Sequence, residues 1–290
     1  DRAGNFTVQN SDFLLVLGSR LNIRQISYNW KSFARHAFKV MVDIDSAEIQ
    51  KPTLSIDMPI HADLKDFLNV LEKQTYKPQP AHTKYVAWCR ERVAKYPVVL
   101  PEYRNKPTPV NPYCFMQTLF DALAENDIIV TADGTACVMA FQAGVIKKGQ
   151  RLYHNSGCAS MGYDLPAAIG AHAASGKRIV CIAGDGSIMM NLQELQTIAS
   201  KKMPVKLIIL NNDGYSSIRQ TQHNYFPDNI VGCGPESGVI FPDFKKICEA
   251  FGFGFRRCDN HDDIKSAIAA WLQADGAQAL EIILDKDQSF

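Results

Sequence analysis

Residues 179–220 read IVCIAGDGSIMMNLQELQTIASKKMPVKLIILNNDGYSSIRQ, and this stretch decides the fold. It contains two apolar runs, 179–183 and 205–210, and each stops at a polar turn that contains glycine. Between the runs lies a helical segment whose apolar residues recur at three- and four-residue spacings. The order of strand, helix and strand predicts a βαβ unit with parallel strands.

The two polar turns carry the candidate chemistry. Asp185 and Asn212 follow the carboxyl ends of their strands, where open α/β sheets bind ligands. A carboxylate and an amide oxygen suit Mg²⁺, which takes few protein ligands and leaves the others to water and phosphate. Gly184 and Gly186 allow a bulky anion to approach the backbone, and Ser187 begins a helix whose free N–H groups favour phosphate. Each turn alone is common, but together they predict a diphosphate bridged by magnesium.

The spacing of these turns resembles the signature of thiamine diphosphate enzymes. GDGS is followed by NN, and 24 residues separate Gly186 from Asn211. In that family the aspartate and the second asparagine bind Mg²⁺ through their side chains, and the residue two positions later binds through its carbonyl. The resemblance therefore assigns the metal to Asp185, Asn212 and the backbone of Gly214. The residues that follow, Tyr215 and Ser216, are expected to begin a helix over the site.

A second strand-to-helix turn precedes this stretch, at ADGTA (132–136). It resembles the first diphosphate loop of the family, which includes Gly134. The resemblance implies that the Thr135 hydroxyl and the Ala136 N–H contact the outer phosphates. Without the resemblance, this segment is an ordinary strand-to-helix turn.

The run NSGCASMGYDLPAAIGAH (155–172) resembles the family segment GSMGY-x-LPAAIGA. By that match Met161 supports the bent cofactor beneath its thiazolium ring, the Ala159 carbonyl accepts a hydrogen bond from the aminopyrimidine, and Ser160 lies against the cofactor. The alternative for Met161 is a methionine of the hydrophobic core, which is the commoner environment of this residue.

Composition limits the remaining possibilities. The chain has 290 residues, 46% of them hydrophobic, which is long enough for two α/β domains. A net charge of +1 gives no reason to expect nucleic acid or a membrane surface as partner, and no apolar run of 18 residues or signal peptide is visible. The eight cysteines form no CxxC pair, which favours reduced thiols in a cytoplasmic protein over disulfides or zinc. Because the chain starts at Asp1 and in mid-pattern, we expect a fragment of a longer protein.

We expect three parts along the chain: 1–75, a linker at 76–109 that contains a short helix, and a diphosphate-binding domain at 110–290. The first part, with strands at 12–17 and 38–44 and a helix at 63–72, resembles the second half of the central domain of acetolactate synthase. In that family the domain holds FAD. By position the FAD-lining residues are Gly18, Ser19, Arg20, Asn22, Arg24 and Asp63. The alternative is a domain without flavin whose arginines pair with surface acids.

The C-terminal part predicts helices at 241–251 and 260–273 and strands at 253–258 and 278–284. Residues 223–240, rich in Gly, Pro and Asn, predict a mobile loop, either a lid or an ordinary surface loop. The sequence His-Asp-Asp at 261–263 is expected to cap the last helix rather than to bind metal.

The resemblance implies an α/β enzyme that uses thiamine diphosphate and Mg²⁺ to decarboxylate a 2-oxo acid and to release or transfer the activated aldehyde. It is closest to acetolactate synthase but departs at two positions. Thr135-Ala136 replaces a Gln-His pair and is closer to pyruvate decarboxylase, and Thr221 replaces a tryptophan. A carboligase, a decarboxylase and a non-catalytic homologue therefore stay open. A phosphoryl transferase should carry GxxxxGK[ST], and the sequence has none.

In the family a glutamate that activates the cofactor comes from an N-terminal pyrimidine-binding domain, usually of a second subunit. No counterpart is visible in this sequence. We therefore expect this chain to hold the diphosphate half of a site in a homodimer or tetramer, and to be inactive and weak in cofactor binding when isolated.

Overall fold

The structure, a computed structural model, describes residues 2–289, with the side chain of Arg24 left out. It divides into two compact units, Asp1–Val98 and Val99–Phe290. The second unit contains the stretch 179–220. The expected linker, 76–109, spans the division, and its helix α5 (Pro80–Lys95) packs against α1 (Arg2–Gln9) in the first unit.

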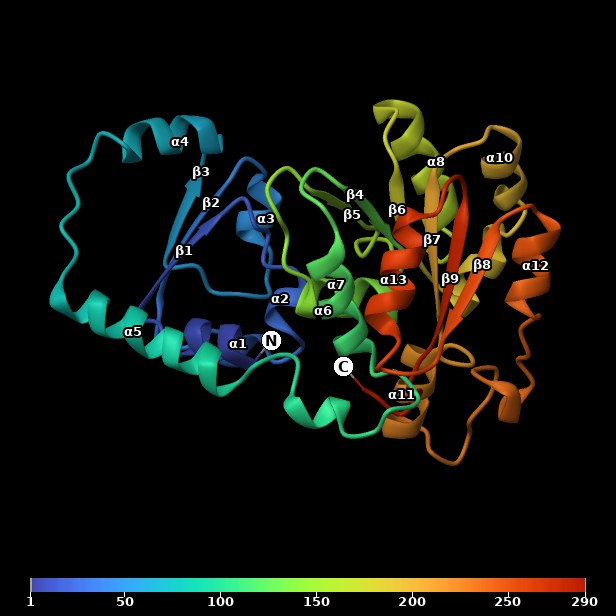
Figure 1. Cartoon of the computed structure of the whole chain (residues 1–290). Coiled ribbons are helices and arrows are strands. Elements are labelled where there is room, and N and C mark those ends of the chain that lie inside the picture. The colour runs from blue at the N-terminus through green and yellow to red at the C-terminus, as the bar shows by residue number, and fades with distance from the viewer. Residues whose placement is uncertain (1, 290) are drawn as a thin grey trace. The chain divides into compact units, whose positions relative to one another are not determined.

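The second unit is built on a six-stranded sheet in which every neighbouring pair is parallel (Figure 1). The strand order is β5-β4-β6-β7-β9-β8. The strands are β4 (Ile128–Thr131), β5 (Arg151–Tyr153), β6 (Ile179–Gly184), β7 (Val205–Asn211), β8 (Gly254–Cys258) and β9 (Gln278–Ile283). β6 and β7 are adjacent, with Gly184 opposite Leu210, so the predicted βαβ unit is confirmed.

Helices cover both faces of this sheet, as a doubly wound domain requires. One face packs against α8, α10 and α12 through a core of buried aliphatic and aromatic side chains. The other carries α6, α7 and α13, which contact one another and the strands. The helices are α6 (Pro112–Ala122), α7 (Thr135–Ala143), α8 (Asp164–Ser175), α9 (Asp185–Ile188), α10 (Glu194–Ser200), α11 (Ser216–Tyr225), α12 (Phe244–Ala250) and α13 (Ile264–Gln273). Three short 3-10 turns complete this unit: η2 (Pro101–Arg104), η3 (Met189–Asn191) and η4 (Pro235–Ser237).

Two details of the second unit differ from the sequence prediction. The segment between β6 and β7 is not one helix, because η3 separates α9 from α10. The side chain of Asn191 donates from Nδ2 to the Gly162 carbonyl at 2.7 Å, which ties this interruption to the preceding loop. The strand β5 was not predicted, since its three residues are too few to show an alternating pattern.

The first unit holds a parallel three-stranded sheet in the order β1-β2-β3. Its elements are α1, β1 (Phe13–Leu17), α2 (Ile23–Ile26), η1 (Trp30–Ser32), β2 (Phe38–Asp43), α3 (Ser46–Gln50), β3 (Met58–His61), α4 (Leu64–Leu71) and α5. A small core joins β1 and β2 to the loops around Phe33 and Ala34. The sequence predicted only two of the three strands, because β3 is a short edge strand that contains Pro59 and is mostly exposed.

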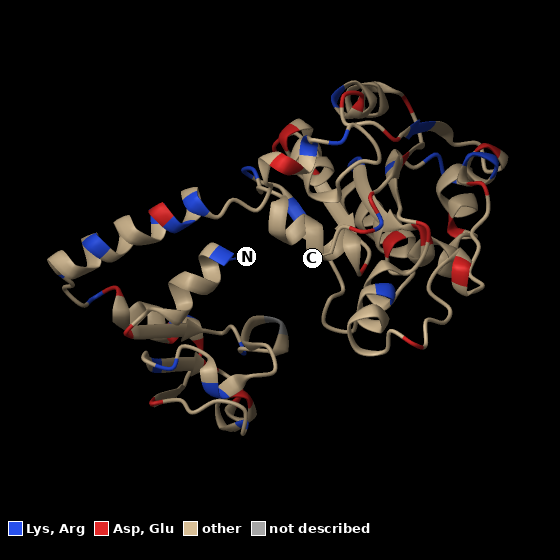
Figure 2. Ribbon diagram, turned by 90° about the horizontal axis from the view of Figure 1, so that it is seen from below, with Lys and Arg blue, Asp and Glu red and all other residues tan. Residues whose placement is uncertain are grey.

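Charged residues of both signs are interspersed along the ribbons of both units (Figure 2). Within the described residues none of the eight cysteines forms a disulfide, and six of them are buried. No helix in the described part of the chain combines the length and apolar character needed to cross a membrane.

Candidate functional site

The candidate site lies where the paths of two neighbouring strands diverge. β4 and β6 are paired at the middle of the sheet. The chain leaves β4 into α7 on one face, whereas it leaves β6 into α9 and α10 on the other. The carboxyl ends of two such strands form the crevice in which doubly wound sheets bind ligands.

The Asp185 carboxylate is the buried centre of this edge. The residue is 1% exposed. Its Oδ1 accepts a hydrogen bond from its neighbour, Gly186 N, at 2.8 Å. Its Oδ2 accepts hydrogen bonds from Asn212 N at 3.1 Å and Gly214 N at 3.0 Å. The two predicted turns, far apart in sequence, are therefore in direct contact, and Asp185 organises the second one.

Burial also sets the protonation of this carboxyl. Removal from water raises the pKa of Asp185 from its ordinary 3.8 to about 6, the three backbone N–H groups oppose the rise, and the negative charge of Asp213 adds to it. A cation beside the carboxylate would favour the charged form and remove this penalty.

Asn212 supplies the observation that a metal would explain. Its side chain is buried, and Nδ2 donates to the Thr135 hydroxyl at 3.2 Å. Its Oδ1 is also buried but has no hydrogen-bond partner among the described residues. Buried oxygens without a partner are rare because each costs desolvation free energy. An amide oxygen without a partner, on a residue whose backbone N–H contacts a buried carboxylate, fits a hard cation such as Mg²⁺.

The oxygen donors of this edge fit magnesium better than zinc, which prefers His and Cys ligands. Within residues 2–289 no cluster of three His, Cys, Asp or Glu is present that could hold a metal. The third predicted ligand, the backbone of Gly214, lies in the turn that Asp185 holds. Gly214 has φ +137°, and a Cβ there would lie 2.1 Å from the Cys233 carbonyl oxygen, so only glycine fits this position.

The first diphosphate loop reaches the same point from β4. Thr135 contacts Asn212 as described, and Gly134 precedes it with φ +62°. Gly134 also lies near α11, since a Cβ on it would be 3.4 Å from Ser217 Oγ. Ala136 is fully buried in the first turn of α7. The structure thus brings Thr135, Asn212 and Asp185 together, as the sequence predicted.

The two glycines of the GDGS turn differ in the space beside them. A Cβ on Gly184 would meet no described atom within 4 Å, which leaves the backbone open there. A Cβ on Gly186 would lie 2.3 Å from the ring of Tyr215. That ring also packs edge-on against Phe241, with centroids 5.7 Å apart. The space beside Gly186 is therefore filled by Tyr215 and not by an approaching anion.

Ser187 is held by a residue that the sequence analysis did not select. Its Oγ donates to the Asp164 carboxylate at 2.6 Å and accepts from Gly162 N at 2.9 Å. Asp164 is fully buried, which raises its pKa, and the hydrogen bond from Ser187 opposes the rise. The sequence signal that could have identified Asp164 is its place as an acid at the start of the apolar helix α8.

Gly162 connects this network to the segment predicted to contact the cofactor ring. Residues 157–161 are all exposed, including Ala159 and Ser160. Met161 is 43% exposed, so the core alternative for it is wrong. Ala159 has φ +55°, an uncommon conformation for a residue with a Cβ. The contact of this segment with a cofactor stays a prediction.

Arg219 holds the turn after β7, residues 211–214, from outside, and the sequence did not indicate it. It is buried, and its guanidinium donates to the carbonyls of Asn212 at 3.2 Å, Asp213 at 2.6 Å and Cys233 at 3.3 Å. Glu236 lies 3.6 Å from its Nε. An arginine in a polar helical segment such as α11 is expected on the surface, so the sequence does not predict its contacts with the three carbonyls.

The predicted mobile loop is more ordered than expected. Residues 223–225 belong to α11, and Gln222 is paired in both directions with the backbone of Val231. The Cys233 carbonyl accepts from Tyr215 N at 2.9 Å. These bonds fasten the loop to α11 and to the turn after β7. That the loop acts as a lid stays a prediction.

The predicted cap of the last helix is also different. Asp263 is the N-cap residue of α13 but makes no side-chain capping bond in the described structure. His261 Nε2 instead accepts a hydrogen bond from Asn111 N at 2.9 Å.

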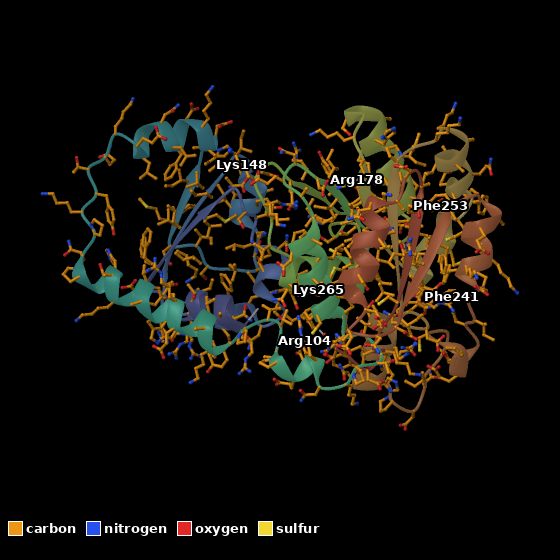
Figure 3. All side chains as sticks on the ribbon, in the orientation of Figure 1. Arg104, Lys148, Arg178, Phe241, Phe253 and Lys265 are labelled. Carbon is orange, nitrogen blue, oxygen red and sulfur yellow. The ribbon has the colours of Figure 1, made fainter. Side chains whose placement is uncertain are left out.

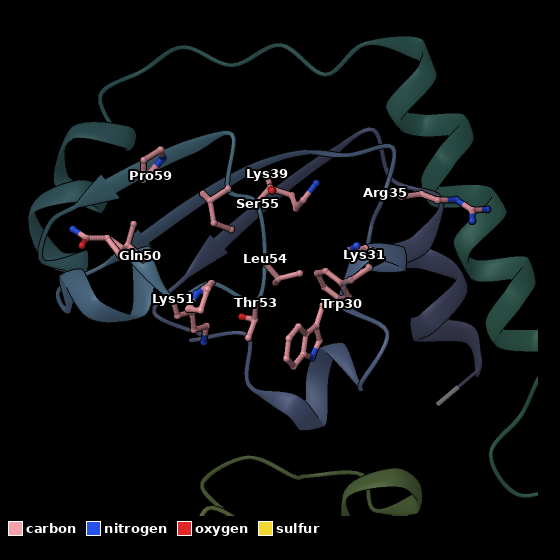
Figure 4. A pocket seen from close by; sticks show the side chains of 14 residues that line it. Trp30, Lys31, Arg35, Lys39, Gln50, Lys51, Thr53, Leu54, Ser55 and Pro59 are labelled. Atoms are coloured by element: carbon pink, nitrogen blue, oxygen red, sulfur yellow. The ribbon is translucent and has the colours of Figure 1, made fainter.

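Two of the residues predicted to line FAD, Arg20 and Asp63, make contacts with other protein groups. Arg20 forms an ion pair with Glu48 at 2.7 Å and is largely exposed, and Asp63 caps α4 through Lys65 N. Arg24 lies outside the described side chains. A cavity of about 670 Å³ in this unit is lined by residues between Trp30 and Pro59, with Arg35 and Lys51 on opposite sides of it (Figure 4).

Comparisons with known proteins define the class. Residues 133–282 match the family described as thiamine pyrophosphate enzyme, C-terminal TPP binding domain, and residues 1–71 match its central domain. The chain belongs to the thiamine pyrophosphate (thiamine diphosphate) enzyme family.

Among curated relatives, the acetolactate synthase large subunit of Pyropia yezoensis is 32% identical over 98% of this chain and 48% of its own length. Acetolactate synthase 1, chloroplastic, of Nicotiana tabacum is 32% identical over 97% of this chain and 43% of its own length. The acetolactate synthase isozyme 2 large subunit of Escherichia coli (strain K12) is 29% identical over 98% of this chain and 50% of its own length. The chain spans about half the length of the curated relatives it matches.

Proposed function

We propose that this chain forms the diphosphate- and magnesium-binding half of a thiamine diphosphate-dependent enzyme that decarboxylates a 2-oxo acid and transfers the activated aldehyde to an acceptor, as the name acetolactate synthase of its relatives suggests. The observation that carries the proposal is the buried Oδ1 of Asn212, which has no partner among the described residues, on a residue whose backbone N–H donates to the Asp185 carboxylate. The family membership supports the cofactor.

Each part of the crevice has a role in this proposal. Asp185, Asn212 and the Gly214 carbonyl hold Mg²⁺, which neutralises the diphosphate. The Thr135 hydroxyl and the Ala136 N–H hold the outer phosphate. The exposed segment 159–161, with Met161, would support the ring end of the cofactor. Thiamine diphosphate, when bound, supplies the electron sink for the loss of CO₂, and the chain supplies position and electrostatics.

The remaining half of the site is assigned to a pyrimidine-binding domain, as in the family, from a second subunit of a homodimer or tetramer. Support comes from the share of the relatives that this chain spans, about half. Under this proposal the chain acts as a fragment and, taken alone, binds cofactor weakly and has no turnover. A cytoplasmic location and FAD in the first unit also stay predictions; a flavin absorption band near roughly 450 nm in the purified full-length protein would establish FAD.

A decarboxylase of the pyruvate decarboxylase type is the second candidate, and Thr135-Ala136 in the first diphosphate loop favours it. Assay of the full-length protein for CO₂ release from pyruvate, with and without a second 2-oxo acid, separates the two. Formation of a carboligation product identifies the first, and release of free aldehyde identifies the second. A non-catalytic homologue would give neither product.

The metal site is tested by Asn212→Leu. The variant removes the unpartnered oxygen, so the metal-free protein should lose no more than about 1 kcal/mol of stability, the worth of the hydrogen bond to Thr135. Its affinity for Mg²⁺ at saturating thiamine diphosphate should fall more than about tenfold, measured by calorimetry. Titration with ATP and Mg²⁺ is the control. Uptake of ATP but not of thiamine diphosphate would contradict the proposal.

A further inference from the structure

One acidic residue stands in the middle of an otherwise apolar buried strand. Glu281 in β9 is 1% exposed, and its neighbours Leu280 and Ile282 are fully buried. A carboxylate in such a place is tolerated only when partners satisfy both of its oxygens.

The partners of Glu281 come from the strands on both sides. Oε2 accepts from Arg257 Nε, on β8, at 2.6 Å. Oε1 accepts from Asn211 Nδ2, the last residue of β7, at 2.7 Å. In the sheet Glu281 stands opposite Arg257 and Ile209, and Asn211 lies two residues beyond Ile209 on the same face. Glu281 on β9 therefore links β7 and β8, and its contact on β7 is with Asn211, where the turn of residues 211–214 begins.

This contact fixes which way the Asn211 amide points. An asparagine side chain has a donor end and an acceptor end. Because Nδ2 is bonded to Glu281, Oδ1 faces Asp213 N and accepts from it at 3.1 Å. Asp213 has φ +58°, so the turn depends on this hydrogen bond to hold a left-handed residue. The flanking N–H groups of Asn212 and Gly214 can then reach Asp185.

We propose that Glu281 is a positioning residue for the metal site. Without contacting the ion, it orients Asn211 and so sets where the Asn212 amide oxygen and the Gly214 carbonyl lie. The inference rests on the proposed magnesium site and extends it to a residue on a neighbouring strand. Outer residues that orient ligands commonly change metal affinity by about 10- to 100-fold.

The test exchanges the chemistry of the pair. In Glu281→Gln the new amide N–H group faces another N–H donor, on either Asn211 or Arg257, so one hydrogen bond is lost. In Asn211→Asp two carboxylates come into contact and repel each other. Each single variant should weaken Mg²⁺ binding at saturating thiamine diphosphate at least about tenfold, measured by calorimetry on the full-length protein. In the double variant N211D/E281Q the new amide donates to the new carboxylate, which still accepts from Asp213 N, so affinity should return to within about threefold of the wild type.

The matched control is another arginine–carboxylate pair, at the amino ends of strands β4 and β6 of the same sheet. Asp127 Oδ1 is 2.8 Å from Nη2 of Arg178, a residue labelled in Figure 3. Asp127→Asn should lower the melting temperature and leave the Mg²⁺ affinity unchanged. If Glu281→Gln behaves in the same way, Glu281 is only structural and the inference is wrong.

Three further results would overturn the role of Glu281. A folded double variant with weak Mg²⁺ binding would overturn the inference. The double variant keeps the hydrogen bonds and the net charge of the pair, so it can be measured even if a single variant fails to fold. A wild-type full-length protein that takes up no Mg²⁺ with thiamine diphosphate would overturn the metal site and the inference together. Wild-type binding with unchanged single variants would overturn the inference alone.

Discussion

Two aspartates show what separates a candidate metal ligand from an ordinary helix cap. Asp63 follows β3 in the first unit, and Asp185 follows β6 in the second. Both accept backbone hydrogen bonds at the start of a helix. Asp63 is exposed and accepts one bond, from Lys65 N, within its own turn. Asp185 is buried and accepts two of its three bonds from the turn of the neighbouring strand.

The difference lies in the neighbours and not in the residue. Beside β6, the turn after β7 closes over the carboxylate, and Arg219 holds that turn from outside. Beside β3, the turn after its neighbour β2 does not bury Asp63, which stays exposed. A strand-end acid is therefore a candidate metal ligand where the turn of a neighbouring strand closes over it.

The largest expected effect comes from removing the buried carboxylate. Asp185→Ala should weaken Mg²⁺-dependent binding of thiamine diphosphate more than about 100-fold, since even outer partners of metal ligands are worth 10- to 100-fold. Calorimetry on the variant and the wild type measures this. Unchanged affinity would refute the metal assignment.

The glycines of the same turn sharpen the comparison. Gly186→Ala should cost about 1–3 kcal/mol, because its Cβ meets the Tyr215 ring and the packing on Phe241 must shift. Gly184→Ala, with open space around its Cβ, should change stability by less than about 1 kcal/mol. Denaturant unfolding of both variants is the measurement. Equal costs would show that Tyr215 does not require Gly186.

The pH dependence tests the burial of Asp185. Its folded pKa is raised to about 6, so between pH 4 and 6 the folded metal-free protein keeps a proton that the unfolded chain has released. Stability without metal should therefore fall as pH rises through this window. Mg²⁺ requires the ionised form, so its affinity should fall about tenfold per pH unit below 6 and level off above 6. A flat affinity profile from pH 5 to 7 would be inconsistent with this burial.

The smallest effect is expected at the exposed aspartate. Asp63→Ala should cost about 1 kcal/mol through loss of the N-cap of α4. It should not change Mg²⁺ affinity. Thermal unfolding and calorimetry measure the two effects, and a loss of Mg²⁺ binding would show that the two aspartates are not as different as their burial indicates.

The sequence by itself determined the parallel α/β fold and the position of both polar turns. Apolar runs and glycine-containing turns are local signals, so β6, β7 and the oxygens of Asp185 and Asn212 could be found from spacing. The short edge strands β3 and β5 were missed, because three or four partly exposed residues carry too little pattern.

Only the tertiary structure decided which groups meet. The bonds from the turn after β7 to Asp185, the Tyr215 ring on Gly186, and the Asp164–Ser187 pair all join residues more than 20 positions apart. No periodicity encodes such contacts, since they depend on which strands lie side by side and on how far each side chain reaches. For the same reason, the sequence does not reveal that Arg219 and Glu281 contact the turn after β7.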